Sequence, residues 1–270
     1  MTYPSVPGFR VSTDAGVLRL TIDRPDKRNA LDDTVLDALI DAFEAVGRDD
    51  DVRVVLLTGA GEHFCAGADI VARNASGPDD RKPRPGSIQR RLPVQTNRLV
   101  ALVPSVQVPV VCAVRGVAAG VGFHLALLAD FTVAAQSARF VEPFMARGFT
   151  PDSGGTWLLP RRVGHTRAME LLVLGRELSG AEAAEWELVH ATVADDELDA
   201  AAEELVAKLA AMPTVAVGLT KWLVHTGGGL DLDRHLANEA FAMELSSRTQ
   251  DFREGLAAFR EKRAPKFEGR

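Results

Sequence analysis

Two segments rich in small residues each follow an apolar run that is typical of a buried strand. They span residues 61–70 and 115–125. Small residues let a ligand approach the backbone closely and leave amide N–H groups free to donate. Because the second segment leads into a helix predicted over 123–129, its N–H groups would suit a developing oxyanion at the positive end of the helix dipole. The same residues could instead serve only tight turns and close helix packing.

Two side chains, one in the second segment and one further along the chain, are of types that can carry protons. Asp152 precedes the Gly154-Gly155 pair, and the bare sequence favours it as the N-cap of a short helix. A carboxylate facing an apolar pocket would instead have a raised pKa, which suits a proton shuttle. His124 lies in the second small-residue segment, and because an unperturbed histidine side chain changes charge near neutrality, it could act as a second acid or base. Alternatively, His124 only lines a pocket or bonds to a backbone carbonyl.

The elements that would position these residues alternate between strands and helices. The strand candidates are 17–22, which alternates in the β manner, the near-continuous apolar runs 52–58 and 108–114, and the weaker 131–135 and 188–193. A helix between the first two begins at Asp32 or Asp33, with Val35, Leu39 and Phe43 on its apolar stripe. This alternation predicts an α/β core.

The chain after residue 195 looks entirely helical, so we divide it into a core of 1–195 and a helical region of 196–270. Four helix-like stretches, separated by Pro213 and a run of three glycines, cover 197–211, 214–226, 231–247 and 250–263. Residues 74–93 carry four prolines and two glycines, which predicts a long mobile loop.

Composition excludes several classes of function. The formal net charge of −6 over 270 residues argues against a nucleic-acid partner. Two cysteines, Cys65 and Cys112, make no disulfide framework, and no CxxC or HExxH pattern offers a metal site. We see no signal-peptide pattern and no apolar run long enough to span a bilayer. We therefore expect a soluble, cytoplasmic protein without a metal.

Five motifs occur in a fixed order and together carry a resemblance, although each alone is weak. They resemble signatures of the enoyl-CoA hydratase/isomerase (crotonase) family: Arg24-Pro25 with Asn29-Ala30-Leu31, Phe64-Cys65-Ala66-Gly67-Ala68-Asp69-Ile70, the loop 115–125, Pro151-Asp152-Ser153-Gly154-Gly155-Thr156, and Arg253-Glu254-Gly255 with Phe259 and Lys262-Arg263. The resemblance implies a spiral core of β-β-α units and a C-terminal helical trimerisation region. It also implies trimers or dimers of trimers, and an acyl-CoA thioester in which coenzyme A is part of the substrate, not a cofactor.

The resemblance also implies roles for particular residues. The backbone N–H groups of Ala66 and Val121 would form the oxyanion hole, with Val121 standing where the family often has glycine. Phe144 and Trp157 would line the acyl pocket. The residues that would bind the CoA moiety are Arg28, Ala30, Ala68, Asp69 and Ile70, with Phe259 and Lys262 where a neighbouring subunit often contributes.

The chain departs from the family at the two glutamates with which a hydratase holds and activates water. His124 and Phe144 stand at those positions, and Glu142 is two residues from the second. Ordinary hydration is therefore disfavoured. Asp152 and the surrounding residues resemble most closely the branch that isomerises ring-1,2-epoxyphenylacetyl-CoA, which also lacks both glutamates.

We therefore predict an acyl-CoA isomerase that shifts a double bond or opens a ring epoxide, with Asp152 as acid/base and His124 as a second candidate. Three alternatives stay open at this point. One is an enoyl-CoA hydratase of fatty-acid β-oxidation, and another uses Asp152 as a nucleophile, as a dehalogenase of the family does. The third is a non-catalytic acyl-CoA binding protein in which Asp152 is only a cap.

Overall fold

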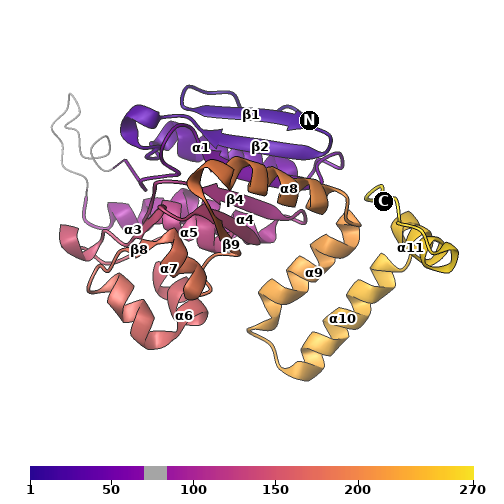
Figure 1. Cartoon of the computed structure of the whole chain (residues 1–270). Coiled ribbons are helices and arrows are strands. Elements are labelled where there is room, and N and C mark those ends of the chain that lie inside the picture. The colour runs from indigo at the N-terminus through magenta and orange to yellow at the C-terminus, as the bar shows by residue number, and fades with distance from the viewer. Residues whose placement is uncertain (70–83) are drawn as a thin grey trace.

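The computed structural model describes residues 1–69 and 84–270, and these form two β-sheets (Figure 1). The larger sheet has the strand order β1-β2-β3-β4-β6-β9, in which β1 and β2 form an antiparallel pair and the other neighbours run parallel. The smaller sheet has the order β5-β7-β8. The strands are β1 (Phe9–Asp14), β2 (Val17–Ile22), β3 (Val54–Gly59), β4 (Val110–Val114), β5 (Val117–Ala119), β6 (Phe131–Ala135), β7 (Arg139–Val141), β8 (Leu178–Ser179) and β9 (Ala191–Val193).

Helices cover both faces of the larger sheet. Helix α8 (Leu198–Ala210) crosses β2, β3, β4 and β6 on one face. Helices α1 (Asp33–Val46) and α4 (Thr96–Ser105) pack against each other on the far side in Figure 1. Every residue of β4 is buried as a result, which explains its unbroken apolar sequence.

The remaining helices complete the core and form the C-terminal region. They are α3 (Ser87–Arg91), α5 (Val121–Leu128), α6 (Gly155–Leu172), α7 (Gly180–Glu185), α9 (Thr214–Gly227), α10 (Leu232–Ser246) and α11 (Gln250–Glu261), with short 3-10 turns at Pro25–Lys27, Leu92–Val94, Met145–Arg147 and Asp195–Glu197. None of the helices in the described ranges is long and apolar enough to cross a membrane.

The C-terminal region leaves the sheet only after α8. Figure 1 shows α9 and α10 as an antiparallel pair that projects from the core, with α11 at the end of α10 and the C-terminus between α11 and the end of α8. The tail returns to the core, because Arg53 donates to the carbonyls of Met212 and Phe267. The Asp251 carboxylate holds the backbone of the same tail. The predicted boundary at 195 thus falls before a helix that packs on the core, and the projecting part begins with α9.

The predicted loop at 74–93 is wrong over its second half. Ser87–Arg91 is a helix and Leu92–Val94 a 3-10 turn, while 70–83 lie outside the described residues. The predicted strand at 188–193 shortens to β9, since the residues before it still belong to the turn after α7.

Candidate active site

A cavity of about 410 Å³ opens where the two small-residue segments meet the start of α6. Most of its wall is apolar or small. The described residues that line it are Ala66, Gly67, Ala68, Ile88, Arg91, Leu92, Gln95, Thr96, Gly120, Val121, Pro143, Phe144, Arg147, Phe149, Thr150, Asp152 and Ser153.

Backbone pairing brings the two small-residue segments together. The N–H of Cys65 donates to the carbonyl of Val117, and the N–H of Ala119 donates to the carbonyl of Cys65. Gly122 packs so closely on this pairing that an added Cβ would lie 2.8 Å from the Cβ of Cys65 and still nearer its carbonyl oxygen. Glycine at position 122 therefore lets the start of α5 approach the first segment.

Hydrogen bonding distinguishes the backbone N–H groups of the residues that line the cavity. The N–H of Ala66 donates to the carbonyl of Arg28 at 3.0 Å, so the prediction that it serves an oxyanion hole is wrong. Among the described residues no acceptor takes the N–H of Ala68, because its neighbours make both bonds to Leu31. Val121, as the first residue of α5, likewise keeps a free N–H within the described chain.

Asp152 lines the cavity at the turn that precedes α6. The prediction that it caps a helix is wrong, because α6 has Gly154 at its N-cap and no side-chain cap bond. Its Oδ1 accepts a hydrogen bond from the Ser153 hydroxyl at 2.6 Å. Ser153 adopts a positive φ of 53°, which turns the chain sharply between Asp152 and α6. Asp152 is the only Asp or Glu among the described lining residues.

His124 lies behind the cavity wall. Its side chain and that of Glu142 are both 0% exposed, and Nε2 of His124 lies 2.8 Å from Oε1 of Glu142. The imidazole stacks on the ring of Phe144, with centroids 6.2 Å apart and planes within 6°. Neither alternative in the sequence analysis, a pocket lining or a bond to a backbone carbonyl, describes this carboxylate pair. Sequence reasoning missed it because the partners lie 18 residues apart on different elements.

Aromatic side chains form one wall of the cavity. Phe144 packs edge-on against Phe149, with ring centroids 5.5 Å apart, and both line the space. Trp157 does not line it. Its side chain is 56% exposed on α6 and lies under the guanidinium of Arg161.

The residues predicted to bind CoA divide into three groups. Arg28 and Ala30 are in the turn that pairs with the first segment through its backbone. Asp69 is buried, and its carboxylate lies 3.2 Å from Nη2 of Arg24. This ion pair joins the end of the first segment to the turn at Arg24. Of the remaining members of the predicted set, Ala68 lines the cavity, and Ile70 is outside the described residues. Phe259 and Lys262 are exposed on and just after α11 and do not line the cavity of their own chain.

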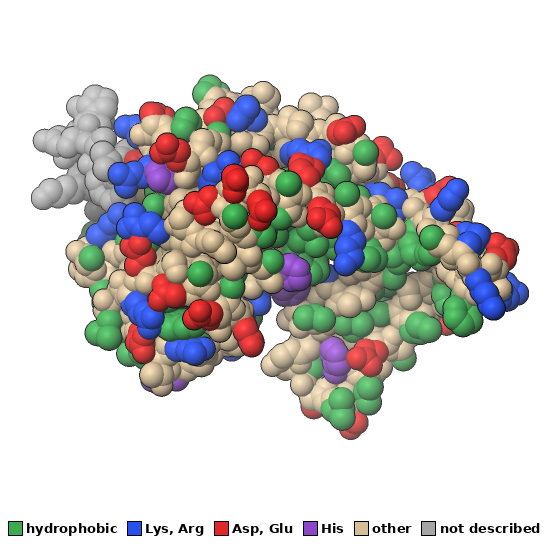
Figure 2. Space-filling view, in the orientation of Figure 1, with side chains coloured by type: hydrophobic (Ala, Val, Ile, Leu, Met, Phe, Trp, Pro, Cys, Tyr) green, Lys and Arg blue, Asp and Glu red, His purple; other side chains and the backbone are tan. Residues whose placement is uncertain are grey.

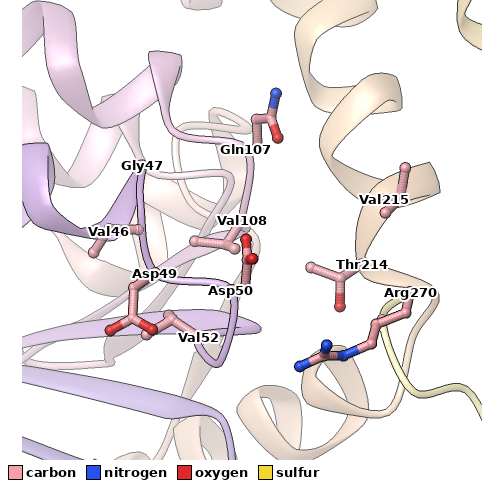
Figure 3. Close-up of a pocket in the computed structure, with 11 residues that line it drawn as sticks. Val46, Gly47, Asp49, Asp50, Val52, Gln107, Val108, Thr214, Val215 and Arg270 are labelled. Carbon is pink, nitrogen blue, oxygen red and sulfur yellow. The ribbon is translucent and has the colours of Figure 1, made fainter. Parts of the chain in front are cut away.

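A second cavity, of about 290 Å³, lies between the core and the start of α9 (Figure 3). Figure 3 shows Asp49 and Asp50 on the core side and Thr214 and Arg270 on the helical side. The Asp49 carboxylate already accepts from the Tyr3 hydroxyl at 2.7 Å. This cavity lies where the C-terminal tail packs against the core, and none of the residues that line it is among the predicted site residues.

Comparisons with known proteins agree with this geometry. A profile of the family described as enoyl-CoA hydratase/isomerase matches residues 12–270. The 1,2-epoxyphenylacetyl-CoA isomerase of Escherichia coli is 42% identical over 260 residues, which cover 95% of this chain and 97% of that protein. The crotonyl-CoA hydratase of Syntrophomonas wolfei is 36% identical over 250 residues, which cover 92% of this chain and 93% of that protein.

A solved structure of the same family has a similar fold. The enoyl-CoA hydratase of Bacillus anthracis matches with a TM-score of 0.89 at 33% identity, covering 97% of this chain and 100% of that one. Since the profile match takes in both small-residue segments, the Asp152 turn and the C-terminal helices, the chain belongs to the enoyl-CoA hydratase/isomerase (crotonase) family and has its fold.

Proposed function

We propose that this protein is an acyl-CoA isomerase that moves a proton along an unsaturated or ring-epoxidised acyl chain. The observation that carries the proposal is the cavity wall, where Asp152 is the only described carboxylate and two backbone N–H groups are free. The 42% identity to an epoxyphenylacetyl-CoA isomerase supports the same reaction class.

The N–H groups of Ala68 and Val121 would hold the thioester oxygen. Both residues line the cavity from opposite segments, and the Val121 group also carries the positive end of the α5 dipole. Such donors stabilise negative charge on the oxygen as the adjacent carbon loses a proton. Ala68 thus replaces Ala66 as the donor that the first segment supplies.

Asp152 would accept that proton and return it elsewhere. Its carboxylate takes the proton from the carbon next to the thioester, the electron pair delocalises toward the oxyanion hole, and the resulting acid protonates a more distant carbon or an epoxide oxygen. No atom is gained or lost overall, so the product is an isomer. Ser153, which donates to Oδ1, would fix the orientation of the carboxylate during both transfers.

The acyl group would lie against the aromatic wall. The edge-on pair of Phe144 and Phe149 favours a flat ring as a third member, because aromatic rings prefer offset or edge contacts over face-to-face stacking. CoA would approach along Arg28 and Ala30. Phe259 and Lys262, which do not reach the cavity of their own chain, would come from a neighbouring subunit.

The test is turnover of unsaturated aliphatic and arylacetyl-CoA thioesters in deuterated water, with product analysis by mass spectrometry. We expect an isomerised product that contains deuterium and no added water. The Asp152→Asn variant should lose 10²- to 10⁴-fold in kcat, roughly the usual contribution of an acid/base residue, and should still bind thioester. Glu204→Gln removes an exposed carboxylate on α8 and is the matched control.

Other outcomes would replace the proposal. A 3-hydroxyacyl product would identify a hydratase. An adduct on Asp152 in the intact-mass spectrum would make that residue a nucleophile. Binding of every thioester without turnover, in the wild type as in the variant, would leave only a binding protein.

A further inference from the structure

The pair formed by His124 and Glu142 is buried and only half satisfied. Each side chain has one polar atom, Nδ1 of His124 and Oε2 of Glu142, that is buried and has no hydrogen-bond partner among the described residues. A half-satisfied polar pair is costly in a low-dielectric interior, and apolar residues of similar size often stabilise a fold as well or better. Fold stability alone therefore does not account for this pair.

Its surroundings are the three segments that build the cavity. His124 lies one helical turn after Val121 on α5. Glu142 directly follows β7 and is two residues before Phe144, whose ring stacks on the imidazole. Gly155 packs against the imidazole edge, where an added Cβ would lie 2.5 Å from Nε2.

Gly155 in turn is bonded to the backbone of the residue that carries the acid, since its N–H donates to the carbonyl of Asp152 at 3.2 Å. The imidazole thus belongs to the helix that carries one oxyanion donor, and it contacts both Phe144 of the aromatic wall and Gly155, which follows the turn that carries Asp152. It makes these contacts from behind, because Phe144 lines the cavity and His124 does not. Nε2 of His124 and Oε1 of Glu142 are at hydrogen-bonding distance, and an ionised carboxylate can only accept, so an ionised Glu142 would take a hydrogen bond from Nε2–H.

We propose that His124 and Glu142 form a positioning pair that fixes the distance between the Val121 N–H and the Asp152 carboxylate, without exchanging protons with the substrate. The inference rests on the proposed isomerase function. It differs from an acid/base role for His124, because a positioning residue needs its hydrogen bond and its shape, not its ability to titrate.

The test combines turnover with a spectroscopic probe that needs no turnover. Cinnamoyl-CoA has a conjugated thioester whose absorption band moves to longer wavelength when hydrogen bonds polarise the carbonyl. Three variants disturb the pair: His124→Leu and Glu142→Leu remove its hydrogen bond, and Gly155→Ala pushes on the imidazole. His124→Gln is the conservative variant, since its amide can still donate to Glu142.

The matched control is Thr132→Val. Thr132 is also buried, and its hydroxyl donates to the carbonyl of Ala126 at 2.6 Å. The variant therefore removes a buried hydrogen bond from the other end of the same helix.

We expect the three disturbing variants to bind cinnamoyl-CoA within about threefold of the wild-type affinity but to lose at least half of the band shift. Their kcat should fall about 10- to 100-fold, the size of loss that a misplacement near 1 Å produces, with an unchanged pH profile. His124→Gln should restore most of both quantities. The double variant His124→Leu/Glu142→Leu should lose no more than either single variant, because partners in one interaction are not additive. Thr132→Val should change neither readout.

Two results would overturn the positioning role. One is a full band shift in His124→Leu and Glu142→Leu. The other is a His124→Gln variant as inactive as His124→Leu with one limb of the pH profile missing, which would make His124 a proton carrier. If the wild type shifts the band but isomerises nothing, the isomerase proposal fails and the band shifts of the variants still decide the positioning role. A wild type that binds without any shift overturns both.

Discussion

At the scale of single residues, Gly122 and Cys65 make one of the close fits between the two small-residue segments. We expect Gly122→Ala to cost about 1–3 kcal/mol, since extra volume forced into a packed region costs this much, and to separate the two segments that carry the oxyanion donors. Urea unfolding measures the first effect and turnover the second. Gly228→Ala is the matched control, because nothing lies within 4 Å of a Cβ added there. Equal stability of the two variants would show that the segments yield easily.

The two cysteine thiols report on the same packing. Burial raises the pKa of the Cys65 thiol to about 12, although a hydrogen bond from the N–H of Gly67 partly offsets this by lowering it. Burial also raises the pKa of Cys112. Since the thiolate is the reactive form, neither should react with iodoacetamide at pH 8 in the native protein, and both should react in urea. Peptide mapping distinguishes the two, and rapid native labelling of Cys65 would mean that the first segment opens readily.

Single residues also show where sequence reasoning ends. Both small-residue segments were predicted from residue type and spacing, and the role of Asp152 was predicted from the family resemblance. The choice between Ala66 and Ala68 was not, because it depends on which N–H a remote carbonyl, that of Arg28, already occupies. The cap interpretation of Asp152 failed for a similar reason, since the left-handed Ser153 moves the helix start to Gly155.

At the scale of elements, α9 is fastened to the core by a buried ion pair. Nζ of Lys221 lies 2.7 Å from Oδ2 of Asp130 and also donates to the carbonyls of Val103 and Val108. Burial alone would raise the pKa of Asp130, but the hydrogen bond from His225 and the charge of Lys221 outweigh it and hold that pKa below its usual value.

We expect Asp130→Asn to lower the free energy of unfolding at pH 7 by about 3 kcal/mol, because it leaves the Lys221 ammonium buried without its partner. A carboxyl group whose pKa is lower in the folded than in the unfolded state stabilises the fold at pH values above its unfolded-state pKa. This contribution is lost as the pH falls through the folded-state pKa. The difference in unfolding free energy between wild type and variant should thus stay constant from pH 6 to 8 and narrow below about pH 4.

The control is Asp199→Asn, which breaks an exposed pair with Arg115 and should lower the unfolding free energy by under about 1 kcal/mol. Urea titrations over this pH range check both, and a similar loss in the two variants would contradict the argument.

The elements themselves were predictable where they are long and periodic. The four C-terminal helices begin and end within two residues of their predicted bounds, aided by caps such as Asp231 and Thr249. The strands β5, β7 and β8 have three residues or fewer, too short for a period to show. They form only because the spiral brings them side by side.

At the scale of the whole molecule, helices α9–α11 expose many large apolar side chains, and a contiguous exposed apolar surface often marks an interaction site. Figure 2 shows hydrophobic side chains along the projecting helices. The most exposed on α9–α11 are Val224, Leu232, Phe241, Met243 and Phe259, the last at 84%. We expect the protein to be a trimer or a dimer of trimers, as the family resemblance implies.

Sedimentation of the wild type and of the Phe241→Asp/Met243→Asp variant tests this expectation. The double variant should sediment as a smaller species, because two charges would have to be buried in the interface. A wild-type monomer would contradict the prediction and would also remove the neighbouring source of Phe259 and Lys262. Ala211→Asp, which adds one charge at the end of α8, serves as the control outside the projecting helices.

The ring of Phe144 has a consequence for how this scaffold can evolve. It stands between the cavity and an imidazole–carboxylate pair that is already in place. Exchange of that ring for a small side chain, which takes a single nucleotide change in the Phe codon, would let water reach the pair. The pocket, whose only described carboxyl group is that of Asp152, would then also present an imidazole and a second carboxyl group. A new chemistry would then begin by unmasking residues that the fold already holds, not by acquiring them.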